Sequence, residues 1–339
     1  MRLRMPAEWT PHDACLMAWP SRESLWGAAF GAARREYAEV ARAIAAFEPV
    51  IMIAAPGQGA AARARCGADI EIIELPLDDS WLRDSGPVFA FTDDGRRVGV
   101  DFRFNAWGGK HRPWDDDDRL TARLLERLGI ERVHSGMVLE GGSFTVDGEG
   151  TLITTEQCLL HPNRNPALTR ADIEAELGRR LGAEKVIWLP YGGVEDTETD
   201  GHVDGVCAFV APGKVVAFLP DDERHPDFAR MRANRDILAA ATDARGRRLE
   251  IVELPQTAYG TVGGEPVEVG YLNFYLANGG AVVPVGGGDG DEAALAVLAG
   301  ALPGRRVVGV PAPTLAYGGG GVHCITQQLP RAPRPVQPA

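Results

Sequence analysis

The chain has 339 residues, of which 45% are hydrophobic and 24% charged, so it holds enough apolar material for a large globular core. Its formal net charge of -12 at pH 7 argues against a nucleic-acid partner and is compatible with a cationic ligand. No apolar stretch approaches the roughly 20 residues that span a bilayer, so no membrane partner is expected.

The cysteines indicate a reducing setting. There are five of them, an odd number, widely spaced and without a C-x-x-C pair: Cys15, Cys66, Cys158, Cys207 and Cys324. This pattern fits neither a disulfide framework nor a zinc site. The first residues lack the apolar run of a signal peptide, and we therefore expect a cytoplasmic location.

Helices and short strands alternate along the chain. Helical periodicity predicts helices over 23–47, after the acidic run 115–118, from Thr169 onward, over 226–242 and over 291–301. The acidic run suits a solvated helix start, and Thr169 suits an N-cap. Strands are expected at 51–54, 70–75, 98–104, 185–189, 249–254 and 306–310.

Turns rich in glycine or polar residues recur in this order of elements. They lie at 83–87, 140–142, 200–204, near Asn273 and at 318–321, roughly 50 to 70 residues apart. The spacing predicts a closed ring of about five small α/β units with all the turns on one central face. The alternative is two α/β domains with a boundary near 163–165. The proline-rich segment 329–339 is expected to be a disordered tail, which leaves 1–328 as a single catalytic domain.

The turns carry a set of residues that suits chemistry on a cation: Asp84, Glu140, His202, Asp204 and Cys324. A cysteine nucleophile needs a histidine as acid and base, and that histidine needs a carboxylate. Two further carboxylates match the N–H donors of a guanidinium. If 202–204 is extended, His202 and Asp204 face the same ligand, because side chains two apart share a face. By the same rule His323 is a poor partner for Cys324.

Each signal has a structural alternative when it is taken alone. Asp84 could close a turn, His202 could be a satisfied core histidine, and Cys324 could be a small core residue behind a flexible loop. Their recurrence at similar places in one pattern favours function.

Longer motifs identify a family resemblance. They include WLRDSGP at 81–87, LEGGS at 139–143, DGHVD at 200–204 and GGGGVHCITQQ at 318–328, with further stretches at 5–9, 12–14, 17–20, 105–110, 163–166, 273–275 and 278–280. In these motifs the chain resembles the agmatine deiminase branch of the guanidino-group-modifying (pentein) superfamily. It is also similar to bacterial peptidyl-arginine deiminases. The resemblance covers nearly the whole chain except the tail.

The resemblance implies a five-bladed α/β propeller with pseudo-fivefold symmetry. It implies Cys324 as nucleophile, His202 as acid and base, Glu140 as the carboxylate of this histidine, and Asp84 and Asp204 as guanidinium ligands. The expected substrate-binding residues also include Trp81, Asn273, Trp107, which could equally be a core aromatic, and Gly321. Gly205 departs from the family pattern, in which Asn is common after the His-x-Asp unit.

The implied reaction is hydrolysis of agmatine to N-carbamoylputrescine and ammonia through a covalent amidino-cysteine, with a small cationic guanidino compound as partner. No metal or organic cofactor is expected, and a homo-oligomer stays open. Three alternatives remain: a deiminase of peptidyl-arginine, free arginine or another guanidine, an amidinotransferase, and a non-catalytic binding protein on the same fold.

Overall fold

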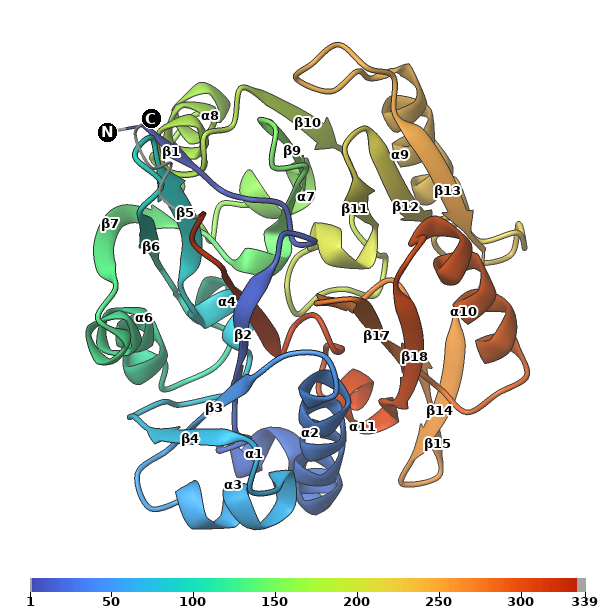
Figure 1. Ribbon diagram of the computed structural model, residues 1–339. Coiled ribbons are helices and arrows are strands. Elements are labelled where there is room, and N and C mark those ends of the chain that lie inside the picture. The colour runs from blue at the N-terminus through green and yellow to red at the C-terminus, as the bar shows by residue number, and fades with distance from the viewer. Residues whose placement is uncertain (1, 256, 334–339) are drawn as a thin grey trace.

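The structure, a computed structural model, describes residues 2–255 and 257–333. These residues form a mixed α/β fold with six β-sheets, and five of the sheets belong to units that share one strand order. Figure 1 shows the units following one another around the centre of the molecule. None of the helices in these two ranges is long and apolar enough to cross a membrane.

Each of four units begins with an antiparallel pair of strands, continues through a helix, and ends in a third strand parallel to the second. Their elements are β5 (Val88–Thr92), β6 (Arg97–Arg103), α6 (Asp115–Leu128) and β7 (Glu131–Val138); β8 (Phe144–Val146), β9 (Thr151–Thr155), α7 (Glu156–Leu159), α8 (Arg170–Leu181) and β10 (Lys185–Leu189); β11 (Cys207–Ala211), β12 (Lys214–Phe218), α9 (Phe228–Ala240) and β13 (Glu250–Leu254); and β16 (Tyr275–Ala277), β17 (Gly280–Val285), α10 (Gly290–Ala301) and β18 (Arg306–Pro311).

The fifth unit joins the two ends of the chain. Its first strand is the last of the sequence, β19 (Thr326–Pro330), which pairs antiparallel with β2 (His12–Ala18). The unit continues through α1 (Glu23–Trp26), α2 (Phe30–Ala45), β3 (Val50–Ala54), α3 (Gly59–Cys66) and β4 (Glu71–Glu74). The smaller elements are β1 (Leu3–Arg4), α4 (Leu82–Ser85), α5 (Ala106–Gly109), the hairpin β14 (Ala258–Val262) and β15 (Glu265–Val269), and α11 (Pro313–Tyr317).

The elements expected from the sequence are confirmed with ends that agree within two residues, except that the helix expected over 23–47 is divided at Gly27, which has φ 49°, into α1 and α2. Thr169 caps α8 in a capping box with Asp172, as the sequence pattern predicts. The acidic run begins α6, but the expectation that it is solvated is wrong for Asp117. This side chain is 2% exposed and accepts the backbone N–H groups of Asp78 and Asp79 at 2.8 and 3.1 Å. It therefore fixes the segment that leads to Asp84.

The expected tail begins too early. Leu329 and Pro330 are the last residues of β19, and Leu329 is 6% exposed, because this strand completes the sheet of the fifth unit. Residues 334–339 of the expected tail lie outside the described residues.

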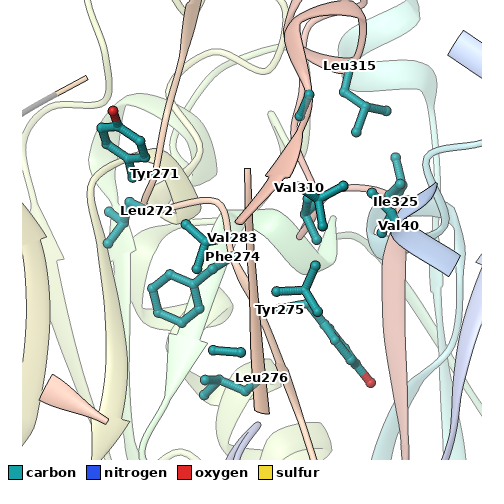
Figure 2. Close-up of a cluster of buried hydrophobic side chains, with 14 of the residues drawn as sticks. Val40, Tyr271, Leu272, Phe274, Tyr275, Leu276, Val283, Val310, Leu315 and Ile325 are labelled. Carbon is teal, nitrogen blue, oxygen red and sulfur yellow. The ribbon is translucent and has the colours of Figure 1, made fainter. Parts of the chain in front are cut away.

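A large apolar cluster anchors the turn that precedes β19. Figure 2 shows Val40 of α2, Tyr275 and Leu276 of β16, and Ile325 among its side chains. Val322 and Ile325 are both fully buried, and burial of one such side chain contributes about 1.5–3 kcal/mol. His323 and Cys324 lie between these two anchors, so the core fixes the position of the turn that carries them.

Candidate active site

The expected site residues occupy equivalent places in the five units. Each lies just before the first strand of its unit: Asp84 in α4 before β5, Glu140 before the 3-10 helix η2 (Gly141–Ser143) and β8, His202 and Asp204 at η3 (Val203–Gly205) before β11, Asn273 before β16, and Cys324 before β19. The common strand order thus brings residues far apart in the sequence to one place.

Cys324 differs from the other cysteines in its exposure. It is partly exposed, whereas the other four are buried, and all five are free thiols. Its Sγ lies 3.3 Å from Oδ1 of Asn273 and 3.6 Å from Oδ2 of Asp204, and its backbone N–H donates to Oδ1 of Asn273 at 3.2 Å. Burial, together with the carboxylates of Asp204 and Asp84, raises the pKa of the Cys324 thiol well above its ordinary value. The thiol is therefore protonated at neutral pH in these surroundings.

Asp84 is held on both carboxylate oxygens. Oδ1 accepts the backbone N–H of Gly142 at 2.9 Å, and Oδ2 accepts Nε1–H of Trp107 at 2.9 Å. The side chain is buried, and burial raises the pKa of Asp84 above its ordinary value. Trp107 has φ 53° and the preceding Ala106 has φ 52°, a left-handed backbone that costs free energy in residues other than glycine. This strained turn aims the indole N–H at Asp84.

Asp204 is held through one oxygen. Its Oδ2 accepts Nδ2–H of Asn273 at 3.1 Å and lies 2.9 Å from Nδ1 of His323. Burial raises the pKa of Asp204, but the hydrogen bond and charge of His323 outweigh burial and bring the pKa below its ordinary value. Asp204 is therefore an anion in the site.

His202 lies beside Asp84 in the interior. Its Nδ1 is 3.9 Å from Oδ2 of Asp84, and the residue is 3% exposed. Burial lowers the pKa of His202, but the Asp84 carboxylate outweighs burial and holds the pKa well above the ordinary value. A Cβ on Gly142 would lie 2.6 Å from Nδ1 of His202, 3.0 Å from Oδ2 of Asp204 and 3.1 Å from Oδ1 of Asp84. These three polar groups therefore converge on a position that only glycine can occupy.

Glu140 makes a different contact from the one expected. Within the described residues it forms no hydrogen bond to His202; its Oε1 accepts Nε–H of Arg164 at 2.6 Å. Arg164 in turn donates to Oδ2 of Asp200 at 2.7 Å and to the carbonyl of Thr199 at 2.8 Å. Glu140 is thus connected to the loop that leads into His202, and both side chains of this ion pair are 1% exposed.

Three buried donors could be considered for a metal ion. Atoms of Glu140, Cys158 and His202 lie within 4.8 Å of one another. The guanidinium of Arg164 already donates a hydrogen bond to the Glu140 carboxylate, and its positive charge disfavours a second cation there. We therefore assign no metal to this group.

Trp81 and Gly321 shape the surroundings of Cys324. Trp81 stacks on Trp26 with ring centroids 5.7 Å apart. A Cβ on Gly320 would lie 2.6 Å from the Trp81 ring, and one on Gly321 would lie 2.6 Å from Oδ1 of Asn273. These two glycines are needed for close approach to neighbouring side chains, rather than for freedom of the backbone around a ligand.

Two cavities reach Cys324. The narrow one is lined by Leu25, Asp79, Trp81, Asp84, Trp107, His111, Glu198, Thr199, Gly318, Gly319 and Cys324. The broad one includes His202, Asp204, Gly205, Asn273 and Gly321, and extends past Glu195, Asp227 and Glu268. All the expected site residues except Glu140 therefore line one or both cavities.

His323 and Glu8 lie at the site but are not among the residues expected from the sequence. The expectation that His323 points away from the site assumes a strand, in which neighbouring side chains face opposite sides, but residues 322–325 form a turn and β19 starts only at Thr326. The alternation rule does not apply to a turn, and His323 reaches Asp204. The same rule supported His202 and Asp204, which lie at a 3-10 helix instead of a strand and still converge. A buried ion pair such as Glu8 with Arg83 leaves no signal in one sequence.

Comparisons with known proteins agree with this geometry. A family model described as Porphyromonas-type peptidyl-arginine deiminase matches residues 4–330. Agmatine deiminases of Pseudomonas aeruginosa (strain LESB58) and Stutzerimonas stutzeri (strain A1501) are each 43% identical to the chain; the alignments cover 98% and 96% of it, and 96% and 95% of the relatives. A solved structure of the agmatine deiminase of Enterococcus faecalis superimposes with a TM-score of 0.93 at 35% identity, covering 97% of this chain and 96% of that one.

Proposed function

Because the chain belongs to the Porphyromonas-type peptidyl-arginine deiminase family, we propose that it is an agmatine deiminase, which hydrolyses the guanidinium of agmatine to N-carbamoylputrescine and ammonia. One observation carries the proposal: a partly exposed thiol, Cys324, lies next to two buried aspartates, Asp84 and Asp204. Two carboxylates can hold a planar cation by charge-assisted hydrogen bonds and turn its carbon toward the sulfur.

The substrate itself activates the nucleophile in this mechanism. Burial and the two carboxylates raise the pKa of the Cys324 thiol and keep it protonated before a cation binds. A bound guanidinium cancels their charge, so the thiol pKa falls and the proton leaves to bulk water. Burial lowers the pKa of His202, but the Asp84 carboxylate outweighs burial and raises it, so His202 is protonated. The site thus combines a thiolate with a histidinium once the cation is bound.

The chemistry then proceeds in two stages. The Cys324 thiolate attacks the guanidinium carbon, and His202 donates a proton to the nitrogen that leaves as ammonia. A covalent amidino-thioether remains. His202, now neutral, takes a proton from water, and the hydroxide attacks the same carbon. The carbon–sulfur bond then breaks and the hydroxyl group loses its proton to bulk water, which releases the ureido product and leaves the thiolate of Cys324 beside the protonated His202. Glu140 acts through Arg164 on the loop that holds His202.

The narrow cavity supports agmatine as the substrate over arginine. Trp81 and Trp107 supply walls for an alkyl chain in this cavity. Glu198 also lines the cavity, and its side chain is 56% exposed and so can be reached by a ligand. Asp79, the other acid away from the thiol, is already held by Arg22 at 2.9 Å. The lining residues within the described ranges include no Lys or Arg that could receive a carboxylate. Oε2 of Glu198 lies 2.8 Å from Nε2 of His111, whereas its Oε1 forms no hydrogen bond to any of the described residues and suits the free ammonium of agmatine.

We further propose that the five units form a five-bladed α/β propeller within a single domain. The common strand order and the pairing of β19 with β2, which joins the chain ends, support this arrangement. A solved structure of DDAH from Pseudomonas aeruginosa has a similar fold, with a TM-score of 0.53 at 16% identity. We propose finally that the enzyme is cytoplasmic and that its partner is a small guanidino cation.

A substrate panel tests the proposed function. Purified protein is given agmatine, arginine and a peptidyl-arginine in a buffer without amine acceptors, and both ammonia and the ureido product are measured. We expect kcat/KM for agmatine to exceed that for arginine at least about tenfold, because a carboxylate would face the acids of the cavity. The variant Cys324→Ser should release no ammonia. Faster turnover of arginine or of the peptide would overturn the substrate, and ammonia release that depends on an added amine would indicate an amidinotransferase.

A further inference from the structure

A buried histidine bridges two carboxylates beside the nucleophile. Nδ1 of His323 lies 2.9 Å from Oδ2 of Asp204, and its Nε2 lies 3.0 and 3.2 Å from the two oxygens of Glu8. His323 is 6% exposed. Glu8 comes from the N-terminal segment before β2 and Asp204 from η3, so the imidazole joins parts of the chain almost 200 positions apart.

The two contacts together require the charged form of this histidine. A neutral imidazole has one N–H and can donate to only one carboxylate, whereas an imidazolium donates from both nitrogens. The other charged group that faces His323 is Arg83, whose Nε donates to the His323 carbonyl at 3.3 Å and whose NH1 donates to Glu8 at 3.1 Å. Burial and Arg83 lower the pKa of His323, but Glu8 and Asp204 outweigh them and raise it above its ordinary value.

The bridge leaves one oxygen of Asp204 for another ligand. Oδ2 accepts from Asn273, contacts His323 and lies 3.6 Å from Sγ of Cys324. Oδ1 makes no hydrogen bond to any of the described residues, and Asp204 lines the broad cavity. A carboxylate fixed through Oδ2 therefore presents Oδ1 to a guanidinium at a set angle, next to the sulfur.

We propose that His323, held by Glu8, is a positioning residue that fixes the Asp204 carboxylate for guanidinium binding and keeps it ionised. This inference rests on the proposed function, and it adds His323 and Glu8 to the residues that act at the site. His323 acts through Asp204, because its ring nitrogens are both occupied by carboxylates and neither is available to the substrate.

Glu8 has a separate part in this arrangement. Arg83 and His323 lower its pKa to about 2 against the opposing effect of burial, so it is an anion at every working pH. Arg83 also donates to the side chains of Gln327 and Gln328 in β19 at 3.1 and 2.8 Å. Glu8 is thus fixed relative to the strand that follows Cys324. Removal of its charge should let His323 lose its proton at a lower pH.

Two variants test the proposal through kinetics. His323→Gln keeps a donor but carries no charge, and we expect KM for agmatine to rise at least about tenfold and the acid limb of the kcat/KM profile to move to higher pH, because Asp204 binds protons more tightly. Glu8→Gln can keep the hydrogen bond while it removes the charge. We expect KM near the wild-type value at acid pH and a rise at alkaline pH, where His323 is neutral.

A matched control separates this effect from loss of stability. Glu48 is a buried carboxylate that contacts His12 at 3.1 Å and Tyr275 at 2.6 Å, and it lines neither cavity at Cys324. Glu48→Gln should lower the melting temperature without a change in KM or in the pH profile. Calorimetry of agmatine binding to Cys324→Ser, with and without His323→Gln, should give at least about tenfold weaker binding in the double variant.

The outcomes are distinct for the two proposals. A wild-type protein that turns over no agmatine contradicts the proposed function. A wild-type protein that does so, with His323→Gln and Glu8→Gln variants that match it in KM, pH profile and binding, contradicts the positioning role alone. A lower melting temperature with unchanged kinetics in both variants leads to the same conclusion.

Discussion

Replacement of Asp204 by Asn should abolish turnover and at the same time make the Cys324 thiol more reactive. Sγ lies 3.6 Å from Oδ2 of Asp204. Two unit charges at that separation repel by about 5 kcal/mol at an effective dielectric constant of ~20. The thiol is partly exposed and the His323 imidazolium offsets part of the repulsion, so we expect the thiol pKa to fall by about 1–2 units, at about 1.4 kcal/mol for each unit.

The assay is alkylation by iodoacetamide, a neutral reagent that reacts with the thiolate. At pH 8 the wild-type thiol is mostly protonated, because burial and the two carboxylates raise its pKa well above the ordinary value, so the expected fall should speed alkylation about 10- to 100-fold. Peptide mapping assigns the label, and the four buried cysteines report the background. Identical rates for wild type and Asp204→Asn from pH 6 to 10 would refute the electrostatic account.

Three further substitutions test separate parts of the site. Trp107→Phe removes the indole N–H from the buried Asp84, a bond to a charged group of about 1.5–3 kcal/mol, so kcat/KM should fall roughly 10- to 100-fold while the protein stays folded by circular dichroism. Glu198→Gln should raise KM for agmatine about two- to fivefold with kcat unchanged, since this acid is largely exposed and such pairs contribute little; a KM equal to that of the wild type would remove Glu198 from recognition. Gly205→Asn should leave kcat/KM within about twofold, because a Cβ there meets nothing within 4 Å.

The order of elements was enough to predict that the turns with the candidate residues occupy equivalent places in the fold. Five turns recur at a regular spacing, and the structure places all five just before the first strand of a unit. That prediction succeeds because it depends on local propensity and on repetition along the chain, both of which one sequence contains. The residue types at the turns then limit the chemistry to a thiol, a histidine and carboxylates.

The contacts between those residues could not be predicted, because packing of distant segments decides them. Glu140 bonds to Arg164 instead of His202, and the two lie 24 positions apart on different turns. Alternation along a strand predicts that His323 faces away from Cys324, yet the chain forms a turn there. Ala106 and Trp107 have a left-handed backbone, which residues other than glycine rarely adopt, and this backbone directs the Trp107 side chain toward Asp84. Such strained or buried polar contacts are where propensity arguments fail.

Mass spectrometry of the protein quenched in acid during turnover tests the central claim most directly. Agmatine is mixed with the enzyme, the reaction is stopped within a turnover, and the intact mass and peptide map are recorded. The proposed mechanism predicts a species heavier by agmatine less ammonia, with the added mass on the peptide that contains Cys324 and absent from Cys324→Ser. An adduct on Cys158, the buried thiol near His202, or ammonia release by Cys324→Ser, would contradict it.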